Sequence, residues 1–456
     1  MIEQVQWQNH LINKYNVSGP RYTSYPTALQ LESGANTQTL TNALEHCQQG
    51  GMSLYIHIPF CHQLCYYCGC NKVVTRHQHK ADLYLDYLSK EMALISAHCK
   101  HLTVEQLHLG GGTPTFLDEQ QMSRLMKMID THFAIAPNSE RSIEVDPRAL
   151  PLARIDELYQ LGFNRISFGV QDFNDDVQNA VNRPQCANEV EALVRRAKEV
   201  GFNSVNVDMI YGLPLQTTQS FAKSMERLID IGPDRVSVFN YAHLPSRFAA
   251  QRKIKDADLP NAAAKLTMFK QTLERMIAAD YQFIGMDHFA KKDDELAIAQ
   301  REGHLHRNFQ GYTLGGDLPL LGLGVSAISQ LNGHIIQNEK ELKHYYHALE
   351  NEQLSACKEI RLNAEDELRA AVIKQLICHF ELDMDDFSKR YQFDFKQHFS
   401  QELQQLQRFV DDGMLEFNNA QIKVTACGIL FIRIICMCFD EYLQSQLNQQ
   451  RFSRVI

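Results

Sequence analysis

The chain has 456 residues, of which 44% are apolar and 22% are charged, and its formal net charge is −9. A single core rarely grows beyond roughly 250 to 300 residues, so we expect one large and one smaller domain. The acidic balance is unfavourable for binding nucleic acid, and we expect no such partner. The longest apolar run, residues 428–439, is interrupted by Arg433 and is shorter than the roughly 17 to 25 residues of a membrane span. The first residues lack the basic and apolar regions of a secretory signal, so we expect a cytoplasmic protein without a membrane span.

An N-terminal arm, residues 1–40, precedes the first strand pattern. From about residue 50 to 330, short β-branched or apolar runs alternate with longer amphipathic runs, a pattern typical of parallel strands joined by right-handed helical crossovers. Strands are predicted at residues 53–60, 106–110, 142–146, 165–170, 205–211, 235–241 and 283–287. Helices are predicted at residues 80–99, 118–133, 153–162, 187–201, 218–232 and 261–279. The pattern therefore predicts an α/β fold with a partial or complete (β/α) barrel over residues 41–355, although the number of units does not separate a closed barrel from an open one or from a doubly wound sheet.

Residues 356–456 have a different character, with helical patterns and little strand. A predicted helix over 363–380 begins at Asn363, a good N-cap residue. Alternating residues around Asn418 and Asn419 predict a hairpin. We expect a smaller, mainly helical, winged-helix-like C-terminal domain.

Polar and glycine residues gather where the predicted strands end. In parallel α/β sheets the C-terminal ends of the strands carry the chemistry, so these residues form the candidate site. They are the cysteine-rich segment after the first strand, the glycines at 110–112, Glu144, Gln171, Asp208 and Asn240.

The segment FCHQLCYYCGCN, residues 60–71, holds four cysteines within ten positions. Thiolates at this density in a reducing compartment select zinc or an iron–sulfur cluster. Structural zinc needs a fourth ligand, for which Cys70, His62 and His57 are candidates. A [4Fe–4S] cluster held by three cysteines would instead leave one iron open for a small chelating ligand. The three cysteines of the C-x3-C-x2-C pattern are Cys61, Cys65 and Cys68.

This cysteine pattern resembles the radical S-adenosylmethionine (SAM) superfamily. The pattern has an aromatic residue, Tyr67, before its last cysteine, it follows the first strand of a β/α series, and GGGTPT at 110–115 is similar to the superfamily's glycine-rich segment. The resemblance implies a barrel of the radical SAM type. It also implies that Cys61, Cys65 and Cys68 bind a [4Fe–4S] cluster and that SAM chelates the open iron.

A longer resemblance, from about residue 10 to the C-terminus, narrows the function. It rests on segments such as SGPRYTSYPTA, IEVDPR, NVDMIYGLP and HRNFQGY, which are similar to those of the enzymes that oxidise coproporphyrinogen III without oxygen in haem biosynthesis. The implied reaction is the oxidative decarboxylation of two propionate side chains to vinyl groups, which gives protoporphyrinogen IX. A 5′-deoxyadenosyl radical made from SAM starts it.

The resemblance also assigns roles to residues. Contacts to the SAM at the cluster are implied for Tyr55, Gly111, Glu144 and Ile328. Contacts to a second SAM molecule are implied for Tyr67, Gly112, Thr113, Gln171, Arg183, Asp208 and Ala242. The chemistry agrees, since carboxylates accept hydrogen bonds from ribose hydroxyls and a guanidinium can bind a carboxylate.

Cys70 has no iron left to bind if SAM holds the fourth one. We therefore predict that its thiol lies toward the substrate and takes part in hydrogen or electron transfer. The substrate has four carboxylates, for which Lys14 and Arg21 are candidate partners. We also expect a separate electron donor, a separate electron acceptor and a monomer.

Two alternatives remain open at this stage. A haem-binding chaperone of the same subfamily would keep the three-cysteine cluster but oxidise nothing. A structural zinc protein on a barrel scaffold would hold no iron.

Overall fold

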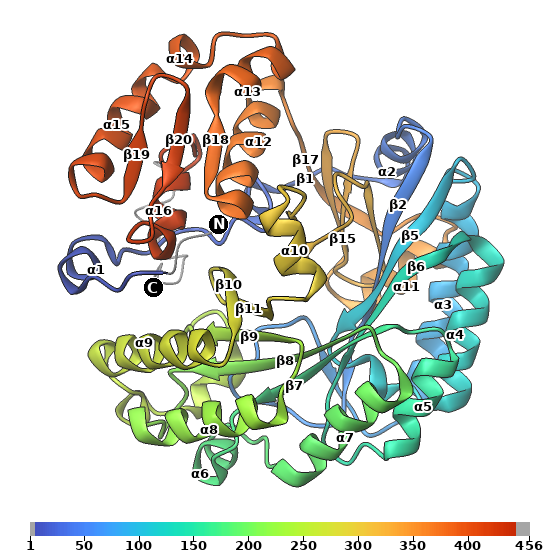
Figure 1. The fold of residues 1–456 in the computed structure, drawn as a ribbon. Coiled ribbons are helices and arrows are strands. Elements are labelled where there is room, and N and C mark those ends of the chain that lie inside the picture. The colour runs from blue at the N-terminus through green and yellow to red at the C-terminus, as the bar shows by residue number, and fades with distance from the viewer. Residues whose placement is uncertain (1–4, 444–456) are drawn as a thin grey trace. The chain divides into compact units, whose positions relative to one another are not determined.

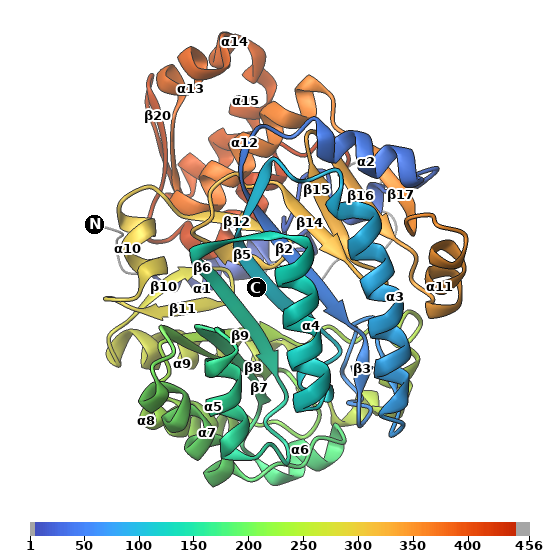
Figure 2. The same ribbon diagram turned by 90° about the vertical axis from the view of Figure 1, so that its right-hand side faces the viewer.

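The computed structural model describes residues 5–443. The chain divides into two compact units. The sheet unit comprises residues 31–275 and 317–361, and the helical unit comprises the described residues of 1–30, 276–316 and 362–456. Figures 1 and 2 label helices and strands of both units.

The sheet unit is built on parallel strands. In spatial order they are β14 (Leu320–Leu323), β2 (Gly50–Ile58), β5 (Leu102–Gly111), β6 (Ala134–Val145), β7 (Arg165–Gln171), β8 (Ser204–Tyr211) and β9 (Arg235–Asn240), each parallel to its neighbour. Beyond β14 the sheet continues through antiparallel strands, in the order β15 (Ile328–Leu331), β16 (His334–Asn338), β17 (Ala356–Arg361) and β1 (Glu32–Ser33). Within the described part of this unit β1 and β9 are not paired with each other. The parallel strands therefore form a partial barrel, the open form of the predicted fold.

Helices cover the outer side of this sheet, as Figures 1 and 2 show. Side-chain caps fix where several of them begin: Asp118 accepts a hydrogen bond from the backbone of Gln121, and Thr217 accepts one from Ser220. The helices are α2 (Thr37–Glu45), α3 (His79–Ser96), α4 (Glu119–His132), α5 (Leu152–Gln160), α6 (Asp175–Ala180), α7 (Ala187–Val200), α8 (Thr218–Ile231), α9 (Ala262–Ala278) and α11 (Leu342–Glu350). The six predicted helices are confirmed, and six of the seven predicted strands are confirmed as parallel strands of this sheet, with shifts at their ends. The seventh prediction, 283–287, is wrong as a parallel strand, because it corresponds to β10 (Tyr281–Gly285), which pairs antiparallel with β11 (His288–Lys291) in the helical unit. The parallel strand β14 has no predicted counterpart.

Strand β6 is longer than predicted. The pattern marks only residues 142–146, whereas the strand begins at Ala134. The added half contains Pro137 and the polar run Asn138–Glu140, which conceal the alternation that the second half displays. The first half of β6 is a strand because it pairs with β5, and its own sequence pattern does not predict this.

Alternation along the strands decides which side chains reach the inner face. In β8, Val205, Val207 and Met209 are fully buried under the helices. Asn206 and Asp208 occupy the alternate positions and project from the opposite face. The polar side chains therefore line the concave side of the sheet.

Glu91 on α3 is a buried carboxylate, only 1% exposed, that accepts hydrogen bonds from the turn after β14, from β16 and from α11. It accepts hydrogen bonds from the backbone N–H of Gly324 at 2.7 Å, from Asn338 at 2.9 Å and from the Tyr345 hydroxyl at 2.7 Å. Burial raises the pKa of Glu91 to about 7 despite these three donors. The contacts fix the turn between β14 and β15, the segment that carries Ile328.

Glu91→Ala is expected to lower the free energy of unfolding by about 3 kcal/mol, because it leaves buried donors without an acceptor. Denaturant titration at pH 5 measures the change, and Glu226→Ala on the exposed face of α8 should stay within about 0.5 kcal/mol of the wild type. Because the folded pKa of Glu91 lies above its ordinary value of 4.5, its contribution to stability is full below pH 4.5 and is lost as the pH rises through about 7. Glu91→Gln should remove that dependence, and an alanine variant as stable as the wild type would contradict the network.

The helical unit brings distant segments of the chain together. Its elements are α1 (Asn9–Tyr15), β10 (Tyr281–Gly285), β11 (His288–Lys291), α10 (Glu295–Arg301), β12 (His306–Asn308), β13 (Gly311–Thr313), α12 (Ala364–His379), β18 (Glu381–Asp383), α13 (Met384–Tyr391), α14 (Phe395–His398), α15 (Ser400–Asp411), β19 (Leu415–Phe417), β20 (Gln421–Val424) and α16 (Ile432–Met437). The predicted hairpin is β19–β20, and β18 adds a third strand. Helices around a small antiparallel sheet agree with a mainly helical domain, and the winged-helix likeness stays a prediction.

Residues 276–316 belong to this unit, whereas the sequence pattern places them with the barrel. The Gln300 amide on α10 donates to the carbonyl oxygens of Ile284 at 2.5 Å and Cys378 at 3.1 Å, so it ties this segment to α12. Tyr312 donates to the carbonyl of Ile377 at 3.4 Å. Contacts between segments so far apart in the chain produce no periodic sequence pattern, so the sequence alone does not predict this grouping.

The N-terminal arm is also tied to the C-terminal segment. The Tyr22 hydroxyl donates to Asp440 at 2.9 Å, and Arg433 donates to the carbonyl of Pro20 at 2.8 Å. Lys14 pairs with Asp412 at 2.6 Å. In the described part of the chain, no helix is both long and apolar enough to cross a membrane.

Candidate active site

The cysteine loop, residues 61–74, leaves the C-terminal end of β2. Short strands β3 (Phe60–Cys61) and β4 (Val73–Val74) pair in parallel and close its base. The tip is held by Asn182, which donates to the carbonyl of Leu64 at 2.8 Å, and by Gln251, which donates to the carbonyl of Tyr67 at 2.9 Å. The loop is therefore anchored by three separate parts of the sheet unit.

Cys61 and Cys68 are half-buried in this loop, Cys65 is buried and Cys70 is exposed, and none forms a disulfide. Within residues 5–443 no three His, Cys, Asp or Glu side chains converge as ligands of one metal ion. The thiolates of a cubane each bind a different iron, so they need not converge on one point. Burial raises the pKa of Cys61 to about 12, and iron binding must therefore displace its proton.

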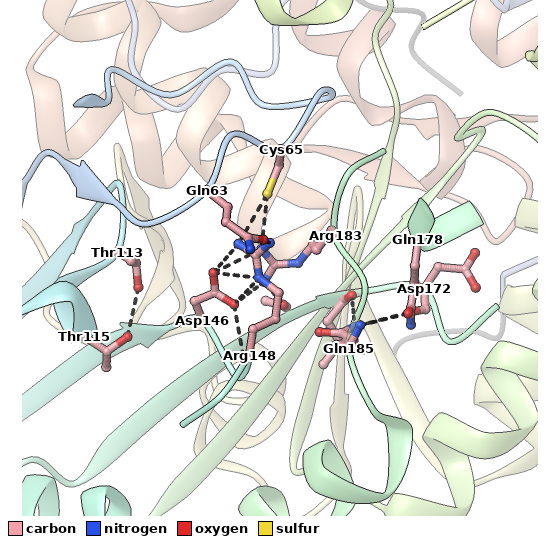
Figure 3. A network of polar contacts seen from close by, with 12 residues as sticks. Gln63, Cys65, Thr113, Thr115, Asp146, Arg148, Asp172, Gln178, Arg183 and Gln185 are labelled. Carbon is pink, nitrogen blue, oxygen red and sulfur yellow. Dashed lines mark hydrogen bonds and ion pairs between the residues drawn. The ribbon is translucent and has the colours of Figure 1, made fainter. Parts of the chain in front are cut away.

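A charged cluster lies against Cys65 (Figure 3). Arg183 approaches the Cys65 sulfur at 3.4 Å and Arg148 approaches it at 3.6 Å. Asp146 binds both guanidiniums, Arg183 at 3.1 Å and Arg148 at 2.5 Å. Burial opposes ionisation of Asp146, but the two cations outweigh it and hold its pKa below the usual range.

Glu144 ends strand β6 beside the glycine-rich segment. Its carboxylate accepts a hydrogen bond from the backbone N–H of Gly111 at 3.2 Å and lies 3.3 Å from His108 Nε2. Burial opposes ionisation, and the His108 contact outweighs it, so the pKa of Glu144 is lowered. The side chain nevertheless keeps 46% of its accessible surface, so a ligand can reach it. Tyr55 stacks on His108 with ring centroids 5.8 Å apart, so it lies beside the pair formed by His108 and Glu144.

The glycines beside Glu144 are required by close approaches of the chain. Gly111 has φ = 120°, a conformation that favours glycine. A Cβ atom at Gly112 would lie 2.7 Å from the carbonyl oxygens of Pro59 and Phe60. The glycine-rich segment therefore runs directly against the start of the cysteine loop.

Asp208 projects from β8 with two donors around it. Asn206 donates to it at 2.8 Å and the Ser167 hydroxyl donates at 3.2 Å. Burial raises the pKa of Asp208 to about 6, and the charge of Glu144 adds to that effect.

The remaining predicted positions fall around the same strand ends. Gln171 ends β7 with φ = 74°. Ala242 is joined to Tyr67, since the Gln251 amide donates to the carbonyls of both. Thr113 is buried, and its hydroxyl lies 3.0 Å from that of Thr115. Ile328 begins β15, which is separated from β2 by one strand, β14.

Sequence reasoning missed Arg148 and Asp146 as site residues, although both stand in the segment IEVDPR. The sequence does show two opposite charges, Asp146 and Arg148, at the end of a predicted strand, and this could have marked them as candidates. His57, a candidate zinc ligand by proximity, instead uses its ring nitrogens on the Tyr55 hydroxyl at 3.0 Å and the Asn71 carbonyl at 3.0 Å. It therefore supports the site through other residues.

The partial barrel with a C-x3-C-x2-C loop at the end of β2 defines a radical SAM protein. Residues 55–228 match the radical SAM superfamily, and residues 362–431 match the HemN C-terminal domain. The chain is 52% identical to the oxygen-independent coproporphyrinogen III oxidase of Escherichia coli strain K12 over the full length of both chains. It is 47% identical to the enzyme of that name from Pseudomonas aeruginosa, again over both full lengths.

A solved structure agrees. The coproporphyrinogen III oxidase of Escherichia coli, described as a radical SAM enzyme, superposes with a TM-score of 0.93 at 50% identity, covering 96% of this chain and 100% of that one. The chain therefore belongs to the family of oxygen-independent coproporphyrinogen III oxidases. It is a radical SAM oxidoreductase that uses a [4Fe–4S] cluster and SAM and acts in haem biosynthesis.

Proposed function

We propose that Cys61, Cys65 and Cys68 hold the [4Fe–4S] cluster through which this chain oxidises coproporphyrinogen III to protoporphyrinogen IX. The observation that carries the assignment is their common loop, which starts at a strand end beside Glu144 and the glycine-rich segment. When bound, the cluster and SAM supply the one-electron chemistry that removes hydrogen from each of two propionates. The protein's own residues bind, orient and shield the reactants.

We propose that Tyr55, Gly111, Glu144 and Ile328 bind the SAM at the cluster. The Glu144 carboxylate is ionised, is partly exposed and retains free acceptor capacity beyond Gly111 and His108. Those properties suit the hydroxyl and ammonium groups of SAM.

A second SAM molecule is proposed beside the first. Its contacts would come from Tyr67, Gly112, Thr113, Gln171, Arg183, Asp208 and Ala242. Two buried polar atoms without a protein partner, Nε of Arg183 and Oδ1 of Asn240, support a polar ligand here. Buried polar groups in folded proteins are otherwise nearly always paired.

Lys14 and Arg21, the candidate partners of the substrate carboxylates, each pair with a protein carboxylate. Lys14 binds Asp412, and Arg21 binds Asp287. A substrate carboxylate would have to compete for either cation, which weakens both as candidates.

An anaerobic assay with coproporphyrinogen III tests the proposal. Protein reconstituted with iron and sulfide, then supplied with SAM and a reductant, should release CO₂ and form vinyl products. Tight haem binding without turnover would favour the chaperone alternative. Stoichiometric zinc in place of iron would favour a structural zinc protein.

SAM binding is expected to weaken as the pH falls through about 6, the pKa of Asp208. Above that pH the carboxylate is ionised and accepts hydrogen bonds from ribose, whereas protonation removes an acceptor. The loss of one such bond predicts about a tenfold higher Kd for SAM at pH 5 than at pH 7.5. Equilibrium binding under anaerobic conditions measures it. Asp208→Asn should bind weakly at both pH values, and an unchanged pH dependence in that variant would contradict the role.

We also propose a cytoplasmic monomer that receives electrons from one separate partner and passes them to another. None of the twelve cysteines forms a disulfide, which suits a reducing compartment. A solution mass of about 52 kDa, the mass of one chain at 52.3 kDa, is the expected result by light scattering.

A further inference from the structure

Cys65 differs from the other proposed ligands in its electrostatic surroundings. Two guanidiniums direct N–H groups at its sulfur, at 3.4 Å from Arg183 and 3.6 Å from Arg148. On the other side of the loop, the cation Lys72 donates to the carbonyl oxygens of Cys68 at 3.1 Å and Cys70 at 3.4 Å. Lys72 also interacts with the Cys68 thiol itself, so a cation lies beside both cysteines. Cys65 is distinguished by two guanidiniums that both donate to its sulfur.

Arg148 is locked in place by contacts at each of its nitrogens (Figure 3). Asp146 accepts from Nε at 2.9 Å and from Nη2 at 2.5 Å, and Gln63 Oε1 accepts from Nη1 at 2.8 Å. Since Gln63 and Cys65 both belong to the cysteine loop, the one guanidinium spans two loop residues. Its side chain is 13% exposed, so solvent screens these contacts little.

The local charge is positive despite the acidic chain. One carboxylate, Asp146, lies between two guanidiniums, which leaves one positive charge beside the sulfur. A cluster gains one negative charge when it is reduced. Hydrogen bonds and positive charge at a ligand sulfur stabilise that extra electron and raise the reduction potential.

We propose that Arg148 sets the reduction potential of the [4Fe–4S] cluster through its contact with the Cys65 sulfur. The inference rests on the proposed assignment of Cys65 as a ligand. Arg148 is the better residue to replace. Arg183 is also proposed to contact SAM and donates a hydrogen bond to the Gly169 carbonyl, so its replacement would change more than the reduction potential. No role in binding SAM is proposed for Arg148, so its replacement separates the potential from the binding of cofactor.

Arg148→Gln keeps a polar side chain but removes the charge and shortens the reach. In a reductive titration followed by electron paramagnetic resonance without SAM, the ratio of reduced to oxidised cluster at a fixed potential should fall about tenfold. For a one-electron couple this is a shift of 59 mV to lower potential. Arg148→Lys keeps the charge but cannot bind Asp146, Gln63 and Cys65 together, so its ratio should lie between those of Arg148→Gln and the wild type.

Arg124→Gln is the matched control. It removes one positive charge from the same unit, at an exposed ion pair with Asp86 that is 2.5 Å long, and its titration should match the wild type. A full iron content with the wild-type ratio in Arg148→Gln would overturn the inference. So would loss of iron in both Arg148 variants, because Arg148 would then be only an anchor of the loop. A full cluster in Cys65→Ala would instead overturn the assignment of Cys65 as a ligand, so the two failures are distinguishable.

Discussion

Replacing Cys61, Cys65 or Cys68 singly by alanine is expected to abolish the cluster and lower product formation by more than about 100-fold. Loss of an outer-shell partner already costs a metal site roughly 10- to 100-fold, and loss of a direct ligand should exceed it. The loop is held at its base by β3 and β4 and at its tip by Asn182 and Gln251, so the fold should survive each change.

Iron and sulfide analysis of anaerobically reconstituted protein, together with turnover, measures this effect. Cys186→Ala is the matched control, because this exposed cysteine precedes α7 without forming a side-chain cap. It should keep four irons and wild-type turnover. A Cys65→Ala variant with a full cluster would show that another residue is the third ligand.

The parts of this fold that the sequence predicts are those with a local cause. Apolar alternation in residues 205–211 fixes both the existence of β8 and the face on which Asp208 projects. Capping residues such as Asp118 and Thr217 mark where helices begin. The gathering of Glu144 and Asp208 at one edge follows from parallel pairing alone.

Other features depend on contacts between distant segments, for which no local pattern exists. The grouping of residues 276–316 with α12 depends on side chains such as Gln300 and Tyr312. The pairing of Lys14 with Asp412 spans almost the whole chain. Arg148 follows a strand end like many surface arginines, and only its contacts with Gln63 and Cys65 distinguish it.

The identity of the metal site and of the substrate can be predicted only in part from local sequence patterns. Spacing alone leaves zinc and an iron–sulfur cluster open at the cysteine loop. The family decides between them, because radical SAM enzymes use a [4Fe–4S] cluster and SAM. Relatives 52% and 47% identical over their full lengths give the substrate, which no feature of composition or period encodes.

Cys70→Ser is expected to keep the cluster while lowering product formation by about 100-fold or more, the scale of a lost proton- or hydrogen-transfer group. Cys70 is the exposed cysteine of the loop. Its electrostatic neighbours include Glu144 and Tyr55, both proposed contacts of the SAM at the cluster. We propose that this thiol lies close to the proposed SAM site, and it would have no iron to bind if three cysteines and SAM complete the cluster.

Three measurements on Cys70→Ser separate the roles of its thiol. Iron content should remain at four per chain, SAM should still be cleaved, and vinyl products should be lost, because serine keeps the size and a hydrogen bond but not the weak S–H bond. Cys186→Ser, at an exposed cysteine outside the loop, should retain all three properties. Loss of iron from Cys70→Ser would make Cys70 a ligand, and unchanged product formation would make it a bystander. Retained SAM cleavage without product would place Cys70 after radical formation, at the transfer of hydrogen or an electron from the substrate.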